Sequence, residues 1–353
     1  MTTNLAFAPF GTVLGRDLKI SPGTMWGIFC AGAASFVPLL FLQFVGEEAV
    51  YVIVAQEMRA NHEYFLTTLY GQSYGRPGLY SLAILLLSRV LGEQHILIAA
   101  RLITASATVL TAVTLAWLIY KLFKDRLFAA FGAAVFLSGD VLLQRGWLAY
   151  SDPIFSFFVF SAMACLWVAV EERRYSLLIL AAFALIASFL TKLPTGYLCY
   201  IVLGSVLLWR HPNWKFLLTP WSISTHLIAI AFPILWNYAI AGDSVFPTVW
   251  QHAESIVRES GAYSFAYFIG RFSSYPLRLI WHLMPISAVI LYALWSRKFS
   301  SERFWQNSLV IAGLTIAINL LPYWFVPGSR TRYIMPIYPL HDVRRTAFCK
   351  MYH

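Results

Sequence analysis

The chain is dominated by long apolar stretches, each close to the length that a helix needs to cross a lipid bilayer. A crossing helix requires ~20 apolar residues to span the ~30 Å hydrocarbon layer. Nine stretches approach or meet this length: 25–44, 97–120, 127–144, 153–170, 175–191, 193–209, 220–240, 276–295 and 306–326. Only 12% of the residues are charged, whereas a soluble domain has roughly 25%. The sequence therefore predicts an all-α polytopic membrane protein with about nine transmembrane helices.

The cations in the short connections between these stretches fall on one side of the predicted membrane. They are Arg16, Lys19, Lys121, Lys124, Arg126, Arg173, Arg174, Arg210, Lys215, Arg297, Lys298 and Arg303. Short cytoplasmic loops are enriched in Lys and Arg, so this side is expected to be cytoplasmic. The other side carries the remaining cations, which lie mostly in two long segments, about 45–96 and 241–275, and in the C-terminal tail. Long loops escape this rule and often carry function, which favours an anionic substrate on the outer side.

The net charge of +10 indicates contact with membrane lipids rather than with nucleic acid. No segment resembles a nucleic-acid-binding motif, and basic membrane proteins attract lipid phosphates. The four cysteines, Cys30, Cys165, Cys199 and Cys349, show no CxxC spacing. They are interpreted as small hydrophobic side chains rather than as disulfides or metal ligands.

The first outer loop is predicted to contain two interfacial helices. Residues 78–91 are apolar but short for a crossing, which is typical of a helix lying at the membrane interface. Glu47 and Glu48 begin an amphipathic pattern with Val54 and Met58 on its apolar side. Two carboxylates directly beyond a span are candidates for acid–base chemistry. The alternative is that they cap the interfacial helix, because anions favour a helix N-terminus.

Two more ionisable side chains lie at the outer ends of predicted spans. Asp152 precedes Pro153, and Lys192 lies between two spans that almost no loop separates. Ionisable groups at membrane depth are costly and are usually retained for function. The alternatives are a helix N-cap at Asp152 and a lysine at position 192 whose ammonium extends to the interface.

Four further candidates lie in the outer segments. Arg76 offers a planar guanidinium suited to phosphate oxygens, and the alternative is contact with lipid headgroups. His252 and Arg258 could meet a metal ion or a phosphate, although a single histidine is more often simply hydrogen-bonded. Tyr333 follows Arg332 at the mouth of what would be another span.

These residues belong to short motifs that follow one another from about residue 20 to 340: Glu47-Glu48, Ala55-Gln56-Glu57-Met58, Gly75-Arg76-Pro77, Ala99-Ala100-Arg101-Leu102, Ser151-Asp152-Pro153, Leu190-Thr191-Lys192-Leu193-Pro194 and Arg332-Tyr333 with Pro336. In order and spacing they resemble the polyprenyl-phosphate-sugar transferases of the GT-C superfamily. The resemblance is strongest to the protein O-mannosyltransferase and aminoarabinose–lipid A transferase family. Two positions depart from that family: Glu47 replaces an aspartate, and Gly75 replaces a glutamate.

The resemblance implies an inverting displacement in which a lipid phosphate leaves the anomeric carbon of a polyprenyl-phosphate-linked sugar. Glu47 would act as the base, with Glu48 or Asp152 assisting. Five side chains would bind the donor phosphate: Arg76, Arg101, Lys192, Arg258 and Tyr333. The resemblance implies no definite cofactor and leaves a divalent metal ion open, with His252 as its candidate ligand. Gly75 stands where the family has a glutamate that can help to hold such an ion.

Lipid A is the first choice of acceptor, because it suits a cationic outer face beside the bilayer. A protein Ser or Thr hydroxyl is the second choice. The expected location is the bacterial inner membrane, with the active site on the periplasmic side. A lipid flippase or transporter is an alternative from another class, although no internal repeat is visible.

The expected domain organisation is one transmembrane glycosyltransferase domain over residues 1–340. Residues 341–353 form a polar, basic tail, where the resemblance implies a further span. The expectation is a truncated or frameshifted product that lacks the soluble C-terminal domain. An inactive remnant is therefore a third functional alternative.

Overall fold

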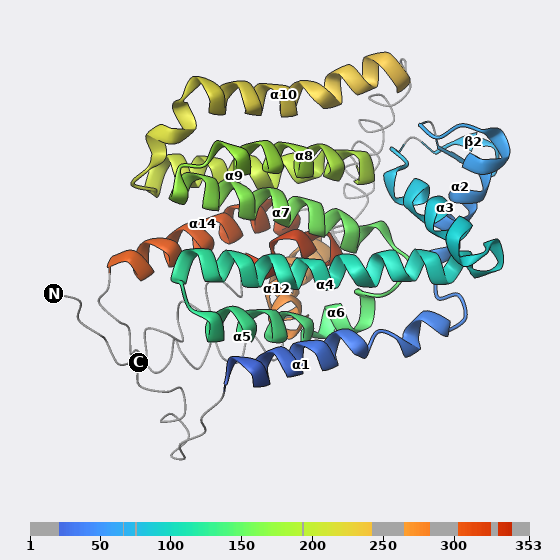
Figure 1. The fold of residues 1–353 in the computed structure, drawn as a ribbon, viewed down its shortest axis with the longest axis horizontal. Coiled ribbons are helices and arrows are strands. Elements are labelled where there is room, and N and C mark those ends of the chain that lie inside the picture. Colours follow the sequence, from blue (N-terminus) through green and yellow to red (C-terminus); the bar gives the residue numbers. More distant parts are fainter. Residues whose placement is uncertain are drawn as a thin grey trace.

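The computed structural model describes residues 21–65, 67–74, 76–192, 194–241, 265–282, 303–325 and 331–340. These ranges are almost wholly helical (Figure 1). The α-helices are α1 (Pro22–Ala34), α2 (Glu48–Asn61), α3 (Leu79–Leu91), α4 (Ile96–Phe123), α5 (Arg126–Leu137), α6 (Asp140–Arg145), α7 (Ser151–Glu172), α8 (Tyr175–Lys192), α9 (Thr195–Arg210), α10 (Pro220–Trp236), α12 (Phe265–His282) and α14 (Arg303–Phe325). The shorter elements are η2 (Pro38–Phe41), η3 (Glu93–His95), η4 (Trp214–Leu218), η5 (Asn237–Ala241) and η7 (Thr331–Ile337), with strands β1 (Thr68–Leu69) and β2 (Gln72–Ser73).

Five segments of the described ranges are long and apolar enough to cross a membrane. They are Pro22–Phe41, Glu93–Phe123, Ser151–Glu172, Tyr175–Lys192 and Asn307–Phe325. Helices α3, α5 and α9 are also apolar but shorter. The predicted all-helical membrane fold is confirmed, and the two helices expected in the first outer loop are present as α2 and α3. The total of nine spans stays a prediction for the whole chain.

One predicted span is interrupted. The apolar stretch 127–144 forms α5 up to Leu137, and α6 begins only at Asp140. Gly139 between them has an extended backbone with ψ 132°, and glycine is a weak helix former. The predicted span 276–295 falls within the described ranges only up to residue 282, where it forms the end of α12.

Helix α7 is the centre of the bundle, and α4, α8, α9 and η7 pack around it (Figure 1). Trp167, Phe160 and Met163 are among its fully buried side chains. Gly196 allows α9 to approach closely, because a Cβ atom there would lie 2.6 Å from Cγ2 of Val159 and 2.8 Å from Oγ of Ser188. Small residues at such contacts are typical of helices packed in membranes.

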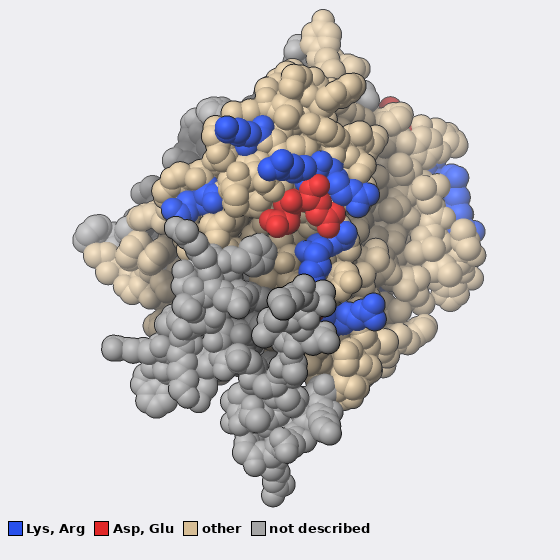
Figure 2. Space-filling model, turned by 60° about the vertical axis from the view of Figure 1, so that its left-hand side comes forward, with Lys and Arg blue, Asp and Glu red and all other residues tan. Residues whose placement is uncertain are grey.

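The two ends of the bundle differ in their chemistry. At the end expected to be cytoplasmic, acidic side chains gather inside a ring of Lys and Arg (Figure 2). Glu172 lies 2.9 Å from Lys121, 3.6 Å from Lys124 and 3.6 Å from Arg174. Cations from separate connections thus share one end, as predicted. The other end carries α2, α3 and the strands (Figure 1). The predicted tail 341–353 lies outside the described residues.

Candidate active site

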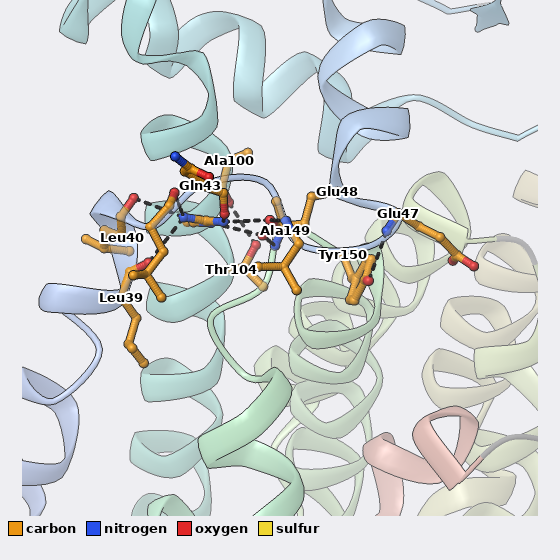
Figure 3. Close-up of polar contacts among 12 residues, drawn as sticks. Leu39, Leu40, Gln43, Glu47, Glu48, Ala100, Thr104, Ala149 and Tyr150 are labelled. Atoms are coloured by element: carbon orange, nitrogen blue, oxygen red, sulfur yellow. Dashed lines mark hydrogen bonds and ion pairs between the residues drawn. The ribbon is translucent and has the colours of Figure 1, made fainter.

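Glu47 is held at the start of α2 through its backbone. Its N–H donates to Oη of Tyr150 over 3.2 Å. The preceding Gly46 has φ 62°, and a Cβ atom there would lie 2.7 Å from the same oxygen. Only glycine adopts this conformation readily, and only glycine leaves room for the tyrosine. The side chain of Glu47 is exposed and points away from Glu48 (Figure 3).

Glu48 has a different environment, although it is the next residue. Its carboxylate accepts from Nε and Nη2 of Arg101 over 2.9 and 2.6 Å, and both side chains are 0% exposed. The same carboxylate accepts from the backbone N–H groups of Val45 and Ala149, each over 2.8 Å. Glu48 therefore ties the first outer loop to α4 and to the approach to α7 (Figure 3).

The guanidinium of Arg101 also donates hydrogen bonds to backbone carbonyl groups in the segment that precedes α2. Its guanidinium donates to the carbonyl oxygens of Leu39, Leu40, Leu42 and Gln43. These carbonyls lie in η2 and directly after it, at the end of the first span, where the chain leaves helical structure. The structure therefore places Arg101, a predicted phosphate ligand, in a buried network. Its carboxylate and carbonyl partners are all within the protein.

Asp152 and Lys192 meet near the same end of the bundle. Nζ of Lys192 donates to Oδ1 of Asp152, joining the start of α7 to the end of α8. The ammonium also lies 5.0 Å from the ring centroid of Tyr333 and 5.7 Å from that of Phe155. Cations are attracted to the faces of aromatic rings at such distances. The structure thus brings together three predicted site residues from separate segments.

Tyr51 is a member of this group that the sequence did not single out. Its hydroxyl lies 2.9 Å from Oγ of Ser151, and its ring packs edge-on against Tyr80. Burial, followed by the proximity of Tyr74, raises the pKa of Tyr51, and the nearby charge of Asp152 adds to the increase. Tyr51 lies one helical turn after Glu47, and this spacing could have indicated that it belongs to the site. An aromatic residue on an amphipathic helix, however, usually indicates a packing role.

Arg76 lies in the same outer loop. Its guanidinium carbon is 5.1 Å from the ring centroid of Tyr74, and the side chain is half-buried. The carbonyl oxygen of Arg76 accepts from the hydroxyl of Thr67 over 2.5 Å. Arg76 therefore lies in the same loop segment as Tyr74, whose proximity contributes to the raised pKa of Tyr51.

Four consecutive residues, Ala149 to Asp152, connect these groups. Ala149 contacts Glu48, Tyr150 contacts the backbone of Glu47, Ser151 contacts Tyr51, and Asp152 contacts Lys192. The start of α7 and the two residues before it therefore contact both α2 and the end of α8. Ionisable groups at such a junction are typical of a functional site in a membrane protein.

Two predicted site residues, His252 and Arg258, lie outside the described residues, as does Gly75. In the part of the chain that the structure describes, no group of three His, Cys, Asp or Glu side chains could hold a metal ion. The described residues therefore do not fit a metal site, and no chemistry is assigned to one.

The described helices form a membrane fold in which carboxylates and cations collect at one end of the bundle. The family model described as dolichyl-phosphate-mannose-protein mannosyltransferase matches residues 51–242. This match covers more than half of the chain, so the protein belongs to that family.

The solved structures that share the fold include those of two proteins. The first is ArnT from Cupriavidus metallidurans bound to undecaprenyl phosphate, with a TM-score of 0.71 and 17% identity over 92% of this chain and 60% of ArnT. The second is the archaeal oligosaccharyltransferase AglB from Archaeoglobus fulgidus, in complex with an inhibitory peptide and a dolichol-phosphate. It has a TM-score of 0.54 and 13% identity over 91% of this chain and 50% of AglB. The chain thus spans less than two thirds of the length of either protein.

Proposed function

We propose that this protein transfers a sugar from a polyprenyl phosphate to an acceptor on the periplasmic side of the bacterial inner membrane. Residues 1–340 would act as one transmembrane glycosyltransferase domain. The observation that carries this proposal is the meeting of Asp152, Lys192 and Tyr333 at the end of the bundle that also holds α2. The family match supports a sugar donor on a polyprenyl phosphate, and so does the ArnT-like fold, which in that protein accompanies bound undecaprenyl phosphate.

Lys192 and Arg76 would hold the donor phosphate. Both cations lie against aromatic rings at the outer end, Lys192 against Tyr333 and Arg76 against Tyr74. A preorganised cation stabilises the negative charge that develops on a departing phosphate. Asp152 accepts from Lys192, so it would orient the ammonium rather than react itself.

Glu47 would be the base. Its exposed carboxylate extends from a backbone that Tyr150 holds in place, so it could reach an acceptor hydroxyl. Glu48 would instead be a positioning residue, because Arg101 and two backbone N–H groups occupy its carboxylate. Arg101 would likewise support the loop rather than bind phosphate.

The reaction balances without a cofactor. The acceptor oxygen forms a bond to the anomeric carbon, and the bond from that carbon to the phosphate oxygen breaks. The electron pair of the broken bond goes to the phosphate, where Lys192 and Arg76 stabilise it. The proton of the acceptor hydroxyl goes to Glu47. Attack opposite the leaving group inverts the configuration of the sugar.

The acceptor is proposed to be lipid A. The ArnT-like fold covers 92% of the chain, and a cationic outer face suits a phosphorylated lipid. A protein hydroxyl is the second candidate, because the matching family model is named for protein mannosyltransferases.

Mass spectrometry of lipid A and of surface glycoproteins, from cells with and without the protein, tests this function. We expect a sugar-sized mass increase on lipid A that depends on the protein. The increase should disappear with Lys192→Gln and persist with the control Arg89→Gln, an exposed cation on α3. A sugar found only on proteins would select the second acceptor. No protein-dependent sugar on either acceptor would overturn the proposal.

A further inference from the structure

The motif Ala55-Gln56-Glu57-Met58 contains a carboxylate that the proposed chemistry does not use. Glu57 lies on α2 opposite the hairpin formed by β1 and β2, in which Thr68 pairs with Ser73 and Leu69 with Gln72. Oε2 of Glu57 accepts from the hydroxyl of Thr68 over 2.5 Å and from the N–H of Gly71 over 3.3 Å. Glu57 therefore holds the tip of the hairpin against α2.

The tip of this hairpin is a conformation that its sequence does not favour. Tyr70 has φ 54° and Gly71 has φ 74°, so both central residues of the turn have positive φ, as in a type I′ turn. Glycine suits the second position, but the first is costly for a side chain like that of tyrosine. Tyr70 is 75% exposed, so packing does not compensate for this cost. Glu57 instead accepts hydrogen bonds from Thr68 and Gly71, which lie on either side of Tyr70.

The hairpin is connected directly to Arg76. The N–H of Tyr74 donates to the carbonyl oxygen of Thr67 over 2.8 Å, and the Thr67 hydroxyl donates to the carbonyl oxygen of Arg76 over 2.5 Å. Gly78 fixes the base of the loop, because a Cβ atom there would lie 2.7 Å from both Thr67 and Met58. The turn, Tyr74 and Arg76 are therefore parts of one strap fastened to α2 by Glu57 and Met58.

We propose that Glu57 is a positioning residue for the phosphate-binding guanidinium of Arg76, acting through the 67–76 strap. This inference rests on the proposed function. If the carboxylate is removed, the turn should relax and Arg76 should sample orientations that miss the phosphate. Donor affinity should then fall while the transfer step, which depends on Glu47, stays the same.

The test uses the full-length protein in lipid nanodiscs titrated with undecaprenyl phosphate. The variants are Glu57→Gln, Tyr70→Asn, their combination, Arg76→Gln and the control Glu63→Gln, an exposed acid in the same loop. Loss of a charge-assisted phosphate contact in Arg76→Gln should weaken binding at least ~10-fold. Glu57→Gln should weaken it ~5- to 10-fold, with a higher KM and an unchanged kcat, and Glu63→Gln should not.

The combined variant separates positioning from general destabilisation. Asn-Gly is the preferred pair for a type I′ turn, so Tyr70→Asn should remove the need for the carboxylate. Binding by Glu57→Gln/Tyr70→Asn should return to within about twofold of the wild type. Hydrogen exchange over residues 67–76 should be faster in Glu57→Gln and normal in the combined variant.

The outcomes distinguish this inference from the proposed function. Normal binding by Glu57→Gln together with weak binding by Arg76→Gln would overturn the inference alone. Failure of Tyr70→Asn to rescue would also overturn it, because the turn would not be the link. Normal binding by Arg76→Gln would remove the phosphate role of Arg76 and the inference with it.

Discussion

Nη2 of Arg101 lies 2.6 Å from Oε2 of Glu48, and both side chains are completely buried. The pair joins α4 to the start of α2, and each partner also bonds to backbone groups of neighbouring segments. A buried charge is tolerated when its partner and hydrogen bonds are in place. The position of Glu47, the neighbouring residue and proposed base, therefore depends on an ion pair that does not itself react.

Breaking this pair should destabilise the protein strongly. In Arg101→Met the carboxylate of Glu48 loses its counter-ion, and four backbone carbonyls lose a donor. Removing one partner of a buried ion pair costs about 3–5 kcal/mol. A thermal unfolding scan in detergent should show a large decrease in Tm.

The control is Lys121→Met at the opposite end of the bundle. Lys121 pairs with Glu172 over 2.9 Å, but both side chains are partly exposed and two other cations also lie near that carboxylate. A pair of this kind contributes about 0–1 kcal/mol. Equal decreases in Tm for Arg101→Met and Lys121→Met would show that burial does not distinguish the two pairs.

Gly46→Ala should slow transfer while leaving donor affinity intact. Alanine is strained at φ 62°, and its Cβ atom would meet Oη of Tyr150 at 2.7 Å. The shift of the backbone would displace Glu47 but not Lys192. Steady-state kinetics should give a kcat lower by about tenfold, which corresponds to ~1.4 kcal/mol, with an unchanged KM for the donor.

A second substitution tests the cause of that loss. Tyr150→Phe removes the oxygen that a new Cβ atom would strike, so Gly46→Ala/Tyr150→Phe should recover part of the rate that Gly46→Ala loses. A double variant as slow as the product of the two single effects would contradict this explanation, because the two changes would then act independently.

Asp152 and Lys192 should act as a coupled pair. Lys192→Gln removes the cation and should weaken undecaprenyl phosphate binding ~10-fold or more. Asp152→Asn keeps the cation but loses the charged partner that orients it, so its effect should be smaller. In a double-mutant cycle the second substitution should add little to the first, with a coupling of about 1 kcal/mol or more. Additive effects would mean that Asp152 acts independently of Lys192.

The contribution of Glu57 should depend on pH. Hydrogen bonds from Thr68 and from the N–H groups of the turn hold the pKa of this carboxyl below its ordinary value of 4.5. A lowered folded-state pKa means that the stabilisation is complete above that ordinary value. It is lost as the pH falls through the folded-state pKa.

The measurement is the ratio of donor Kd values for Glu57→Gln and the wild type at about pH 7, 5 and 3.5. Both proteins bind the same donor, so the effect of phosphate protonation on Kd is the same for both and cancels in the ratio. The ratio should be largest at the highest pH and smaller at the lowest, because protonation of Glu57 begins only below its ordinary pKa. A ratio that does not change with pH would show that the charge of Glu57 has no part in holding the turn.

The placement of the ionisable side chains was predictable, because it follows from where the apolar stretches end. Asp152 and Lys192 each stand at the end of a predicted span, and the order of the spans predicted that both lie at the same end of the bundle. The sequence did not reveal that the two side chains touch, because that depends on how α7 and α8 pack. The break at Gly139 was missed because a single glycine in an apolar run does not exclude a helix.

The roles of Glu48 and Arg101 could not be read from the sequence. Adjacent glutamates look alike in a motif, but one is exposed and the other is fully buried. Burial of a charge depends on a partner 53 residues away, which no local pattern indicates. The hairpin was missed for another reason: Tyr-Gly is not a usual type I′ pair, and the contacts that Glu57 makes with Thr68 and Gly71 join segments that are separate in the sequence.

Glu47→Gln in vesicles containing undecaprenyl-phosphate-linked sugar and lipid A tests the central claim most directly. The measurement follows sugar transfer and donor binding in the same preparation, with Glu63→Gln as the matched control. We expect transfer to fall to background while donor Kd and Tm stay at wild-type values, because Glu47 would accept a proton and bind no phosphate. Transfer by Glu47→Gln at the wild-type rate would contradict the account.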